Sequence, residues 1–327
     1  MMLRRVALLV LAAIVLMQGG ATHAAPAQPP QPLERGTITK RPYVVMVDNH
    51  PDAYPQSGMD NAAMVYEALA EFGITRFMVV YVPGSSPEAK AIGPVRSARL
   101  YFVQWAMGLK GVYAHAGGSP NGLALAQTTK EILNLDALRR DGTAYFTRST
   151  KRFAPHNLYT STASLAAATL KNKAVDLDNK DIGYLYKDEL AAEKRPTSQA
   201  FSYYFLYKEE LAGWTYDATS NSYLRTRRTK PAVEATTGKR LNAKNVVVIE
   251  VKERKIVGDP KGRIEQDVVG SGVGMLFQDG SATAITWKKE TASAPLHFYL
   301  KDGSEVQFNR GQIWVAAIPN AANLTIK

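Results

Sequence analysis

The chain has 327 residues, no cysteine and a formal net charge of +11 at pH 7. The lack of cysteine excludes disulfides, thiol nucleophiles, cysteine-ligated metals and attachment of a lipid through a lipobox cysteine. An excess of Lys and Arg suits an anionic envelope polymer or a lipid-linked phosphate ligand, although many envelope proteins are basic only for solubility. The sequence contains no zinc-finger, RRM-like or basic-zipper pattern, so we expect no nucleic acid as a partner.

The first residues predict export from the cytoplasm. Two arginines precede an apolar run from Val6 to Met17, and small residues follow up to Ala24. This order is typical of a secretory signal peptide over residues 1–24. The run is shorter than the about 20 residues of a membrane span, and an uncleaved signal that anchors the protein to the membrane is the alternative. We expect an extracytoplasmic protein, secreted or held in the periplasm or cell envelope, whose net charge falls from +11 to +9 on cleavage.

The N-terminal half of the chain reads as alternating strands and helices. Residues 25–40 are rich in proline and have no apolar period, which predicts a flexible tether. Residues 43–47 form a buried strand, residues 60–73 carry apolar side chains at helical spacing and end at Gly73, and residues 76–83 form a second buried strand. Strand, helix and strand in this order predict a βαβ unit and a parallel sheet.

The same pattern continues along the chain. We predict a helix over residues 95–107, a strand over residues 111–116 and a helix over residues 120–138. Ser119 followed by Pro120 is a typical helix start, with an N-cap serine and proline at the first helical position.

The pattern of apolar residues changes after residues 191–200, which are predicted to be a linker. Short β-rich runs follow, and the pairs Asp279–Gly280 and Asp302–Gly303 are strong hairpin turns. The predicted fold is therefore an α/β N-terminal domain with a mostly parallel sheet over residues 41–190, followed by a mostly antiparallel β-rich domain over residues 200–327.

Three polar clusters would meet at one edge of a parallel sheet. Asp48–Asn49 ends the first strand, "IGPVRSAR" follows the second and "HAGGSP" ends the third; ligands bind beyond the carboxyl ends of such strands. Arg96 and Arg99 stand three apart near a predicted helix start and would share one helical face, and the N–H groups of residues 117–119 would be open to an anion. We therefore predict an anion site, with a solvated pair of arginines as the alternative.

Histidines add a second candidate chemistry. His156 lies in the turn "APHN", and with His50, His115 and Asp48 it could complete a zinc-type set. No HxH or HExxH spacing supports that set, so we expect no metal site. His115, at a strand end, is a candidate acid or base, and a core histidine bonded to a carbonyl is the alternative.

Long stretches of the sequence resemble a known family. "RPYVVMVDNHPDAYPQSGMDNAAMVYEALAEFGITRFMVVY", "IGPVRSAR", "HAGGSP" and "APHNLYTS", in this order, resemble the YerB-like family of bacterial envelope proteins. The β-rich tail, with "VVGSGVGMLFQDG" and "GQIWVAAIP", resembles that family's C-terminal domain. The family has no known biochemical activity, and some of its members are described as lipoproteins, whereas this chain lacks the lipobox cysteine.

A fainter resemblance is to the LytR-CpsA-Psr family, whose members transfer polyprenyl-pyrophosphate-linked glycopolymers to peptidoglycan. It is a resemblance of element order and not of sequence, because that family's serine-isoleucine-proline-arginine-aspartate run is absent here. It implies that Arg76, Arg96 and Arg99 hold phosphate and that Asp48 holds a metal, by analogy of fold alone.

Our hypothesis is an exported envelope protein that binds or processes a phosphate- or glycan-bearing anionic ligand through the α/β domain. The candidate catalytic residues are Asp48, His115 and His156. The candidate ligand-binding residues are Asn49, Arg76, Arg96, Ser97, Arg99, Gly117, Gly118, Ser119 and Asn157. The rival is a non-catalytic scaffold or protein-interaction module, and the sequence identifies no cofactor.

Overall fold

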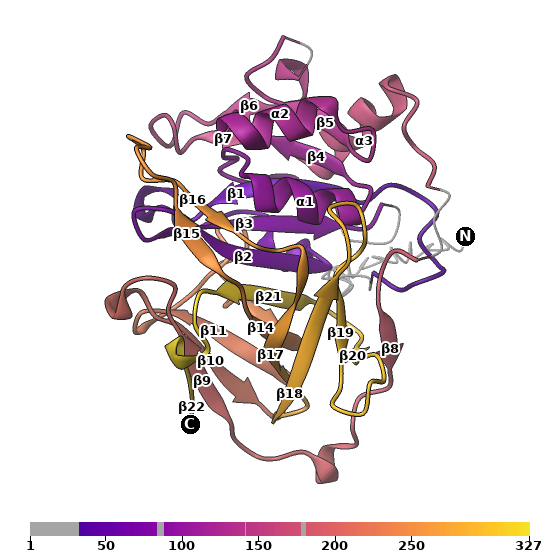
Figure 1. The fold of residues 1–327 in the computed structure, drawn as a ribbon, viewed down its shortest axis with the longest axis vertical. Coiled ribbons are helices and arrows are strands. Elements are labelled where there is room, and N and C mark those ends of the chain that lie inside the picture. The colour runs from indigo at the N-terminus through magenta and orange to yellow at the C-terminus, as the bar shows by residue number, and fades with distance from the viewer. Residues whose placement is uncertain (1–32, 84–87, 141, 178–180) are drawn as a thin grey trace, which may run out of the picture.

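One mixed sheet of ten strands forms the centre of the molecule (Figure 1). The computed structural model describes residues 33–83, 88–140, 142–177 and 181–327. From edge to edge the strands are β5 (Leu133–Asp136), β4 (Val112–His115), β1 (Tyr43–Asp48), β3 (Ile74–Tyr81), β2 (Met64–Glu71), β21 (Ile313–Ile318), β14 (Asn245–Glu250), β17 (Gly270–Gln278), β18 (Ser281–Lys289) and β19 (His297–Tyr299). Because β21 lies between β2 and β14, strands from both halves of the chain form a single sheet.

Smaller sheets and, among the described residues, three α-helices pack around this centre. A second sheet contains β22 (Leu324–Ile326), β9 (Ala200–Tyr203), β10 (Ala212–Asp217), β11 (Ser222–Arg227), β12 (Lys230–Pro231) and β13 (Asn242–Ala243). The strand pairs are β6 (Thr147–Arg148) with β7 (Leu158–Tyr159), β8 (Leu185–Lys187) with β20 (Gln307–Asn309), and β15 (Glu253–Lys255) with β16 (Ile264–Gln266). The helices are α1 (Leu100–Gly108), α2 (Pro120–Thr128) and α3 (Thr162–Lys171). Within the described ranges, no helix is both long enough and apolar enough to cross a membrane.

The central sheet is mixed, so the prediction of a mostly parallel sheet is wrong. β1 runs parallel to β4 but antiparallel to β3, and β3 runs antiparallel to β2. The C-terminal strands are mostly antiparallel, as predicted: β17 pairs in this way with both β14 and β18, whereas β14 and β21 are parallel. The difference in the N-terminal half comes from one element, β2.

Strand β2 occupies the residues predicted as a helix over residues 60–73. Its side chains are buried on both sides of the sheet, which requires a nearly continuous apolar run, and such a run also satisfies helical spacing. Phe72 and Gly73 have φ values of 51° and 79°. Two consecutive residues of positive φ are typical of a tight hairpin turn, so Gly73 connects β2 to β3 and does not end a helix.

The other predicted elements are found with shifted boundaries. Residues 92–99 are extended, so the helix expected from residue 95 begins at Leu100. The helix expected to reach residue 138 ends at Thr128, and β5 follows. The predicted N-cap is confirmed, because the side chain of Ser119 accepts a hydrogen bond from the N–H of Gly122.

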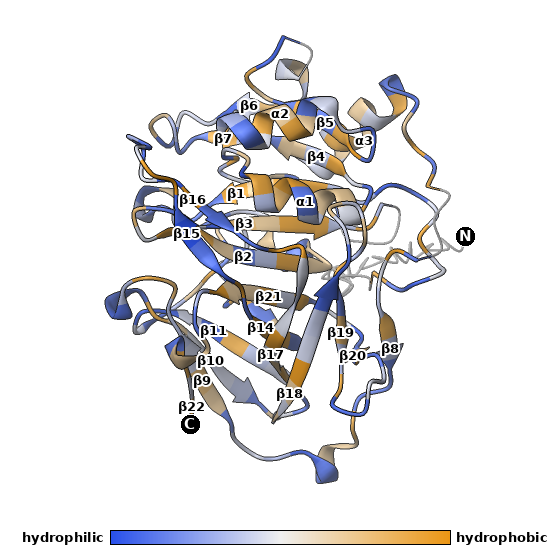
Figure 2. Ribbon diagram, viewed as in Figure 1, coloured by the Kyte–Doolittle hydropathy of each residue, from blue (hydrophilic) through white to orange (hydrophobic). Residues whose placement is uncertain are grey.

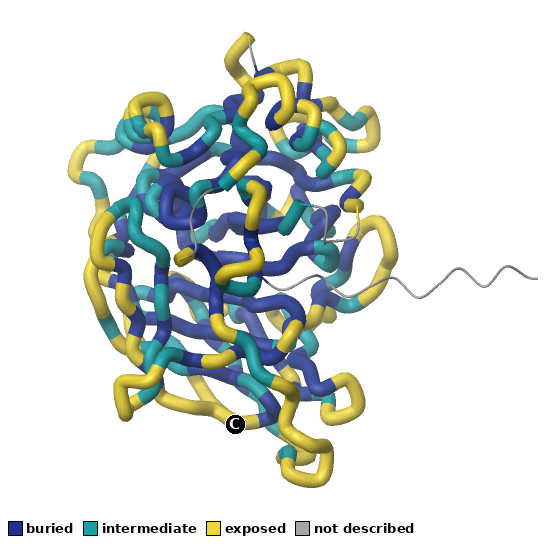
Figure 3. The backbone as a smooth tube through the Cα atoms, turned by 90° about the vertical axis from the view of Figure 1, so that its right-hand side faces the viewer, coloured by how far each residue is buried: buried dark blue, intermediate teal, exposed yellow. Residues whose placement is uncertain are grey.

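The sheet separates two apolar layers. Val44 and Met46 of β1 pack on the side covered by α1, where they belong to the same core cluster as Phe102. Val45 and Val47 face the opposite side, which β9, β10, β11 and α3 cover. In Figure 2 the central strands and α1 are mainly apolar, and in Figure 3 they are mainly buried. The core therefore continues through both halves of the chain.

Only residues 33–40 of the expected tether are among the described residues. The predicted signal peptide and residues 25–32 lie outside the described residues. Leu33 is buried, Glu34 forms a β-bridge with Tyr184, and Arg35 forms an ion pair with Glu305. Residues 33–40 are therefore packed against the fold, and the prediction of a flexible tether is wrong for them.

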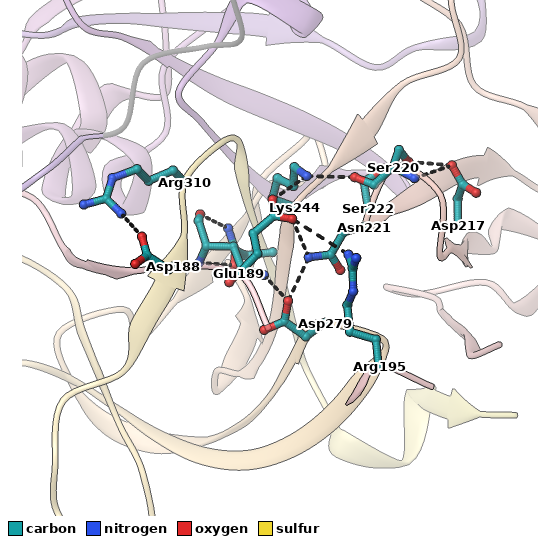
Figure 4. Close-up of polar contacts among 12 residues, drawn as sticks. Asp188, Glu189, Arg195, Asp217, Ser220, Asn221, Ser222, Lys244, Asp279 and Arg310 are labelled. Atoms are coloured by element: carbon teal, nitrogen blue, oxygen red, sulfur yellow. Dashed lines mark hydrogen bonds and ion pairs between the residues drawn. The ribbon is translucent and has the colours of Figure 1, made fainter. Parts of the chain in front are cut away.

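The segment that connects the halves is held by a polar network (Figure 4). Asn221 donates to Glu189 at 2.9 Å and to Asp279 at 2.8 Å, and Lys244 pairs with Glu189 at 2.5 Å. Burial raises the pKa of Asp279, but hydrogen bonds from Lys187 and the neighbouring amides outweigh it and lower the pKa overall. The network fastens the connecting segment to the C-terminal strands, and the predicted division into two domains stays a prediction, because one sheet runs through both.

Candidate functional site

The carboxyl edge of β1 and β4 is extended by residues 92–99. The N–H of Arg96 donates to Met46 at 2.9 Å, and its carbonyl accepts from the N–H of Ala116 at 3.0 Å. The extended segment therefore lies between the two parallel strands just beyond their regular pairing. In an extended chain, residues three apart point to opposite sides, so Arg96 and Arg99 do not share the face that a helix would have given them.

Asp48 is the centre of a charged cluster at this edge. Its Oδ2 lies 2.9 Å from Nε of Arg96 and 2.7 Å from Nδ1 of His156. Its Oδ1 accepts a hydrogen bond from the N–H of His50 at 3.1 Å. A carboxylate can only accept here, so Nδ1 of His156 carries a proton, and in the neutral form of the ring the lone pair is on Nε2. The structure thus brings together three of the predicted residues, Asp48, Arg96 and His156.

A second histidine stacks on this cluster. The rings of His50 and His156 lie 4.5 Å apart between centroids, with an interplanar angle of 18°. Nδ1 of His50 accepts a hydrogen bond from the N–H of Asp52 at 3.2 Å. One ligand-type atom from each of His50, Asp52 and His156 lies within 4.8 Å of the other two. Two rings and a carboxylate from separate segments therefore converge on one small volume.

Arg76 and Arg99 have a different partner from the one predicted. Both guanidinium groups form ion pairs with Glu71, Arg76 through Oε1 and Arg99 through Oε2. They also donate to the carbonyls of Ser97 and Ala98, at 3.3 and 2.7 Å. Burial, reinforced by the neighbouring Arg76, lowers the pKa of Arg99 in spite of Glu71. The two arginines are occupied inside the protein, so the predicted anion site does not have them as open donors.

Two of the three N–H groups predicted for that site, those of Gly117 and Ser119, are also occupied. The N–H of Gly117 donates to Asp136 at 2.8 Å, and the N–H of Ser119 donates to the carbonyl of Ala98 at 3.1 Å. Gly118 forms a β-bridge with Ala98. His115 is completely buried, with its ring nitrogens 2.9 Å from the carbonyl of Gly117 and 2.7 Å from the side chain of Asn134. His115 is thus the core histidine of the alternative interpretation.

Asn157 is bonded to Arg148, one of the residues that line an open basic cleft of about 610 Å³. Its Oδ1 accepts from Arg148 at 2.7 Å, and the loop of residues 149–157 contributes two more cationic residues, Lys151 and Arg152. The cationic side chains that line the cleft are Lys90, Arg148, Lys151 and Arg152. None of the described residues that line it is acidic, and no carboxylate within the described ranges forms an ion pair with these cations. The cleft therefore concentrates positive charge that no acidic side chain of the described residues neutralises.

Asn49 faces a different cavity, of about 230 Å³, between the central and the second sheet. Its side-chain amide donates to Thr75 at 2.7 Å and accepts from Gln56 at 3.0 Å. The floor of the cavity contains the buried ion pair of Glu67 and Arg225, 2.8 Å apart. Glu67 also accepts from the side chains of Tyr203 and Trp314, so its carboxylate is fully bonded within the protein. This arrangement is suited to holding the two sheets together.

Sequence reasoning missed several residues of these sites. Glu71 was not recognised as the partner of two arginines, because the spacing of β2 suggested a helix. Asp52 stands two residues after His50 in the printed sequence, and that proximity was the available signal. Lys90 and Lys151 are far apart in the chain and meet only through the fold.

Comparison with known proteins finds matches over most of the chain. Residues 30–176 match the model described as "Protein of unknown function (DUF3048) N-terminal domain", and residues 201–315 match the corresponding C-terminal domain. A protein of Bacillus subtilis (strain 168) named "Putative lipoprotein YerB" is 30% identical over 292 residues, 88% of this chain and 84% of that protein. The crystal structure of the YerB protein from Bacillus subtilis has a TM-score of 0.76 at 29% identity, covering 89% of this chain and 94% of that chain.

Proposed function

We propose, from the premise that this chain belongs to the YerB-like family of proteins of unknown function (DUF3048), that it is an extracytoplasmic protein which binds a phosphate-bearing envelope polymer in the basic cleft. The envelope location is supported by the basic, apolar first residues and by the name of the Bacillus relative, "Putative lipoprotein YerB". We infer an anionic ligand from one observation: four cationic side chains line one cleft, and none of the described residues that line it is acidic.

Charge balance supports a ligand over a merely solvated surface. Surface cations are ordinarily interspersed with carboxylates, and elsewhere in the described chain many Lys and Arg side chains form ion pairs, as Arg254 does with Glu265 and Asp267. In the cleft, Arg152 instead donates to the carbonyls of Tyr54 at 3.3 Å and Pro55 at 2.7 Å. Its charge is held in place but not neutralised, which is the condition for attracting an anion.

The residue types favour phosphate. Arg148 carries a planar guanidinium group, a type that binds phosphate oxygens, and only its Nη1 is bonded to Asn157. Arg152 contributes its charge, because both of its terminal nitrogens already donate to backbone carbonyls, and Lys90 and Lys151 add flexible point charges. The hydroxyls of Ser161 and Ser164, at the start of α3, line the same cleft. An open cleft of this kind fits a segment of an extended polymer better than a small enclosed substrate.

Binding of poly(glycerol phosphate) tests the proposal. The double variant Lys90→Gln/Lys151→Gln should bind at least about tenfold more weakly than the parent, because each charge-assisted contact contributes about 1.5–3 kcal/mol. The matched control is Lys288→Gln/Lys301→Gln, which removes the same charge from exposed positions of the other half. Isothermal titration at two salt concentrations measures both affinities.

Two results would overturn the proposal. If the control variant loses as much affinity as the cleft variant, binding depends only on total charge. If the parent does not bind the phosphate polymer at all, the rival scaffold hypothesis takes its place. Equal binding of hyaluronate, a carboxylate polymer, would change the ligand class but keep the cleft.

A further inference from the structure

We propose that His50, Asp52 and His156 form a binding site for a divalent transition metal such as Zn²⁺, with Asp48 behind it as the residue that orients His156. The sequence has no HxH or HExxH spacing, and the proximity of His50 and Asp52 was its one local signal for such a site. It depends on two segments that the fold brings together, the turn after β1 and the loop before β7. The proposal does not rest on the anionic ligand of the cleft.

The geometry is that of a site close to its bound form. One nitrogen from each imidazole and one carboxylate oxygen lie within 4.8 Å of one another. Ligands around Zn²⁺ at about 2.0–2.2 Å stand roughly 3–3.5 Å apart, so small rotations of exposed side chains would close the site. Asp52 can make that movement, because its side chain is 72% exposed, and so can His50, at 33%.

Asp48 supplies the second, independent observation. Its carboxylate is almost completely buried and accepts from Nδ1 of His156 at 2.7 Å. That bond places a proton on Nδ1 and leaves Nε2 of the neutral ring available as a metal ligand, and metal-binding histidines commonly have a carboxylate in this position behind them. Arg96, 2.9 Å away, balances the charge of Asp48, so Asp52 provides the negative charge at the metal itself.

The donor set selects the class of metal. Two imidazoles and one carboxylate suit Zn²⁺, Ni²⁺, Cu²⁺ and Fe²⁺, whereas Mg²⁺ and Ca²⁺ prefer oxygen ligands throughout. Three protein ligands leave at least one coordination position for water or substrate, as in catalytic zinc sites. His50 and Asp52, whose side chains are 33% and 72% exposed, leave the site open to solvent, whereas His156 is largely covered at 13%.

The simpler interpretation is that His50 and His156 only pack against each other. Stacking of two imidazoles needs neither a buried carboxylate behind one ring nor a second carboxylate beside the other. The hydrogen bond from the N–H of Asp52 to Nδ1 of His50 explains part of the arrangement as turn geometry. It does not explain why His156, from a segment more than a hundred residues later, has a ring nitrogen within 4.8 Å of ligand-type atoms of both His50 and Asp52.

Zinc titration of the full chain, without a histidine tag and stripped of metal, tests the site. Competition with a chromophoric chelator should show one Zn²⁺ per chain, and Zn²⁺ should raise the melting temperature. His156→Ala and Asp52→Asn should each weaken binding at least tenfold, and Asp48→Asn should weaken it about 10–100-fold through the orientation of His156. His297→Ala, which removes a histidine paired with Glu305 far along the chain, is the matched control and should bind as the parent does.

The outcomes are distinct. If the parent binds Zn²⁺ no more tightly than His156→Ala, or if His297→Ala loses as much affinity, the proposal is wrong. Should His156→Ala fail to fold, Asp52→Asn decides, because its exposed side chain has no role in the core. Co²⁺ in place of Zn²⁺ adds a visible absorption band whose loss in Asp52→Asn reports the ligand directly. All of these measurements are made without any anionic polymer, so they stand or fall independently of the proposed function.

Discussion

Arg225→Met tests whether the ion pair between the two sheets is important for stability. Nη2 of Arg225 lies 2.8 Å from Oε1 of Glu67, and both residues are buried, with exposed fractions of 3% and 1%. The guanidinium also lies 4.4 Å from the ring centroid of Trp314. Burial lowers the pKa of Arg225, but Glu67 and Tyr203 outweigh it and raise the pKa overall. The arginine is therefore charged in the folded protein.

Removing the cation leaves the carboxylate of Glu67 buried, with neutral donors only. Breaking one partner out of a buried pair typically costs about 3–5 kcal/mol. A loss of 1 kcal/mol lowers the melting temperature of a large domain by about 2–4 °C, so we expect a fall of roughly 10 °C. The double variant Glu67→Gln/Arg225→Met should recover much of this loss, because it leaves no unbalanced charge.

Thermal and urea unfolding followed by circular dichroism measure these differences. Lys288→Gln, whose side chain is exposed and paired only with Glu290, is the control and should melt with the parent. The reasoning is refuted if Arg225→Met melts within about 2 °C of the parent, a difference of at most about 1 kcal/mol. It is also refuted if the double variant is no more stable than the single one.

Two further substitutions address other buried charges. Burial, with a contribution from Lys110, lowers the pKa of Lys289 from 10.5 to about 7. Between about pH 7 and pH 10.5 the unfolded chain therefore binds a proton at this residue that the folded chain does not. The free energy of unfolding of the parent should consequently rise with pH in this range. Lys289→Met should remove this rise and stabilise the protein near about pH 6 by at most about 5 kcal/mol; unfolding free energies that change with pH equally in both proteins would contradict the expectation. Glu71→Gln should destabilise the protein by several kcal/mol because it leaves Arg76 and Arg99 without a carboxylate, and Glu71→Gln/Arg99→Met should restore part of the loss in the same unfolding assay.

The elements with local signals could be predicted from the sequence. Ser119 with Pro120 marks a helix start, and the Asp279–Gly280 pair marks a hairpin, because capping and positive φ depend on a few adjacent residues. The strand at residues 43–48 was visible as a short apolar run ending in polar residues. The position of β2 was not, because a strand buried on both faces has no alternation that would distinguish it from a helix.

That one error determined most of the others. With residues 64–71 as a strand, β3 runs in the opposite direction, so Arg76 lies at the start of β3, beside Asp48 in the register of the sheet. Glu67 and Glu71, four apart, would lie on one solvated face of a helix, whereas in the sheet each meets a buried arginine. Long-range pairings of this kind are decided by which strands become neighbours, and a single sequence does not contain that information locally.

The two proposals share the loop of residues 149–157, yet the structure separates their residues. Arg152 contacts the turn after β1 through the backbone carbonyls of Asp52, Tyr54 and Pro55, not through the side chain of Asp52. Replacing that side chain therefore removes a metal ligand while the cationic wall of the cleft stays in place. Conversely, Lys90 and Lys151 are exposed, line the cleft and are not among the three proposed metal ligands, so their removal leaves these ligands in place. Loss of polymer binding with zinc binding retained in the lysine variant, and the reverse in Asp52→Asn, would consequently show that the two sites are separate, whereas a joint loss in either variant would show that they are one.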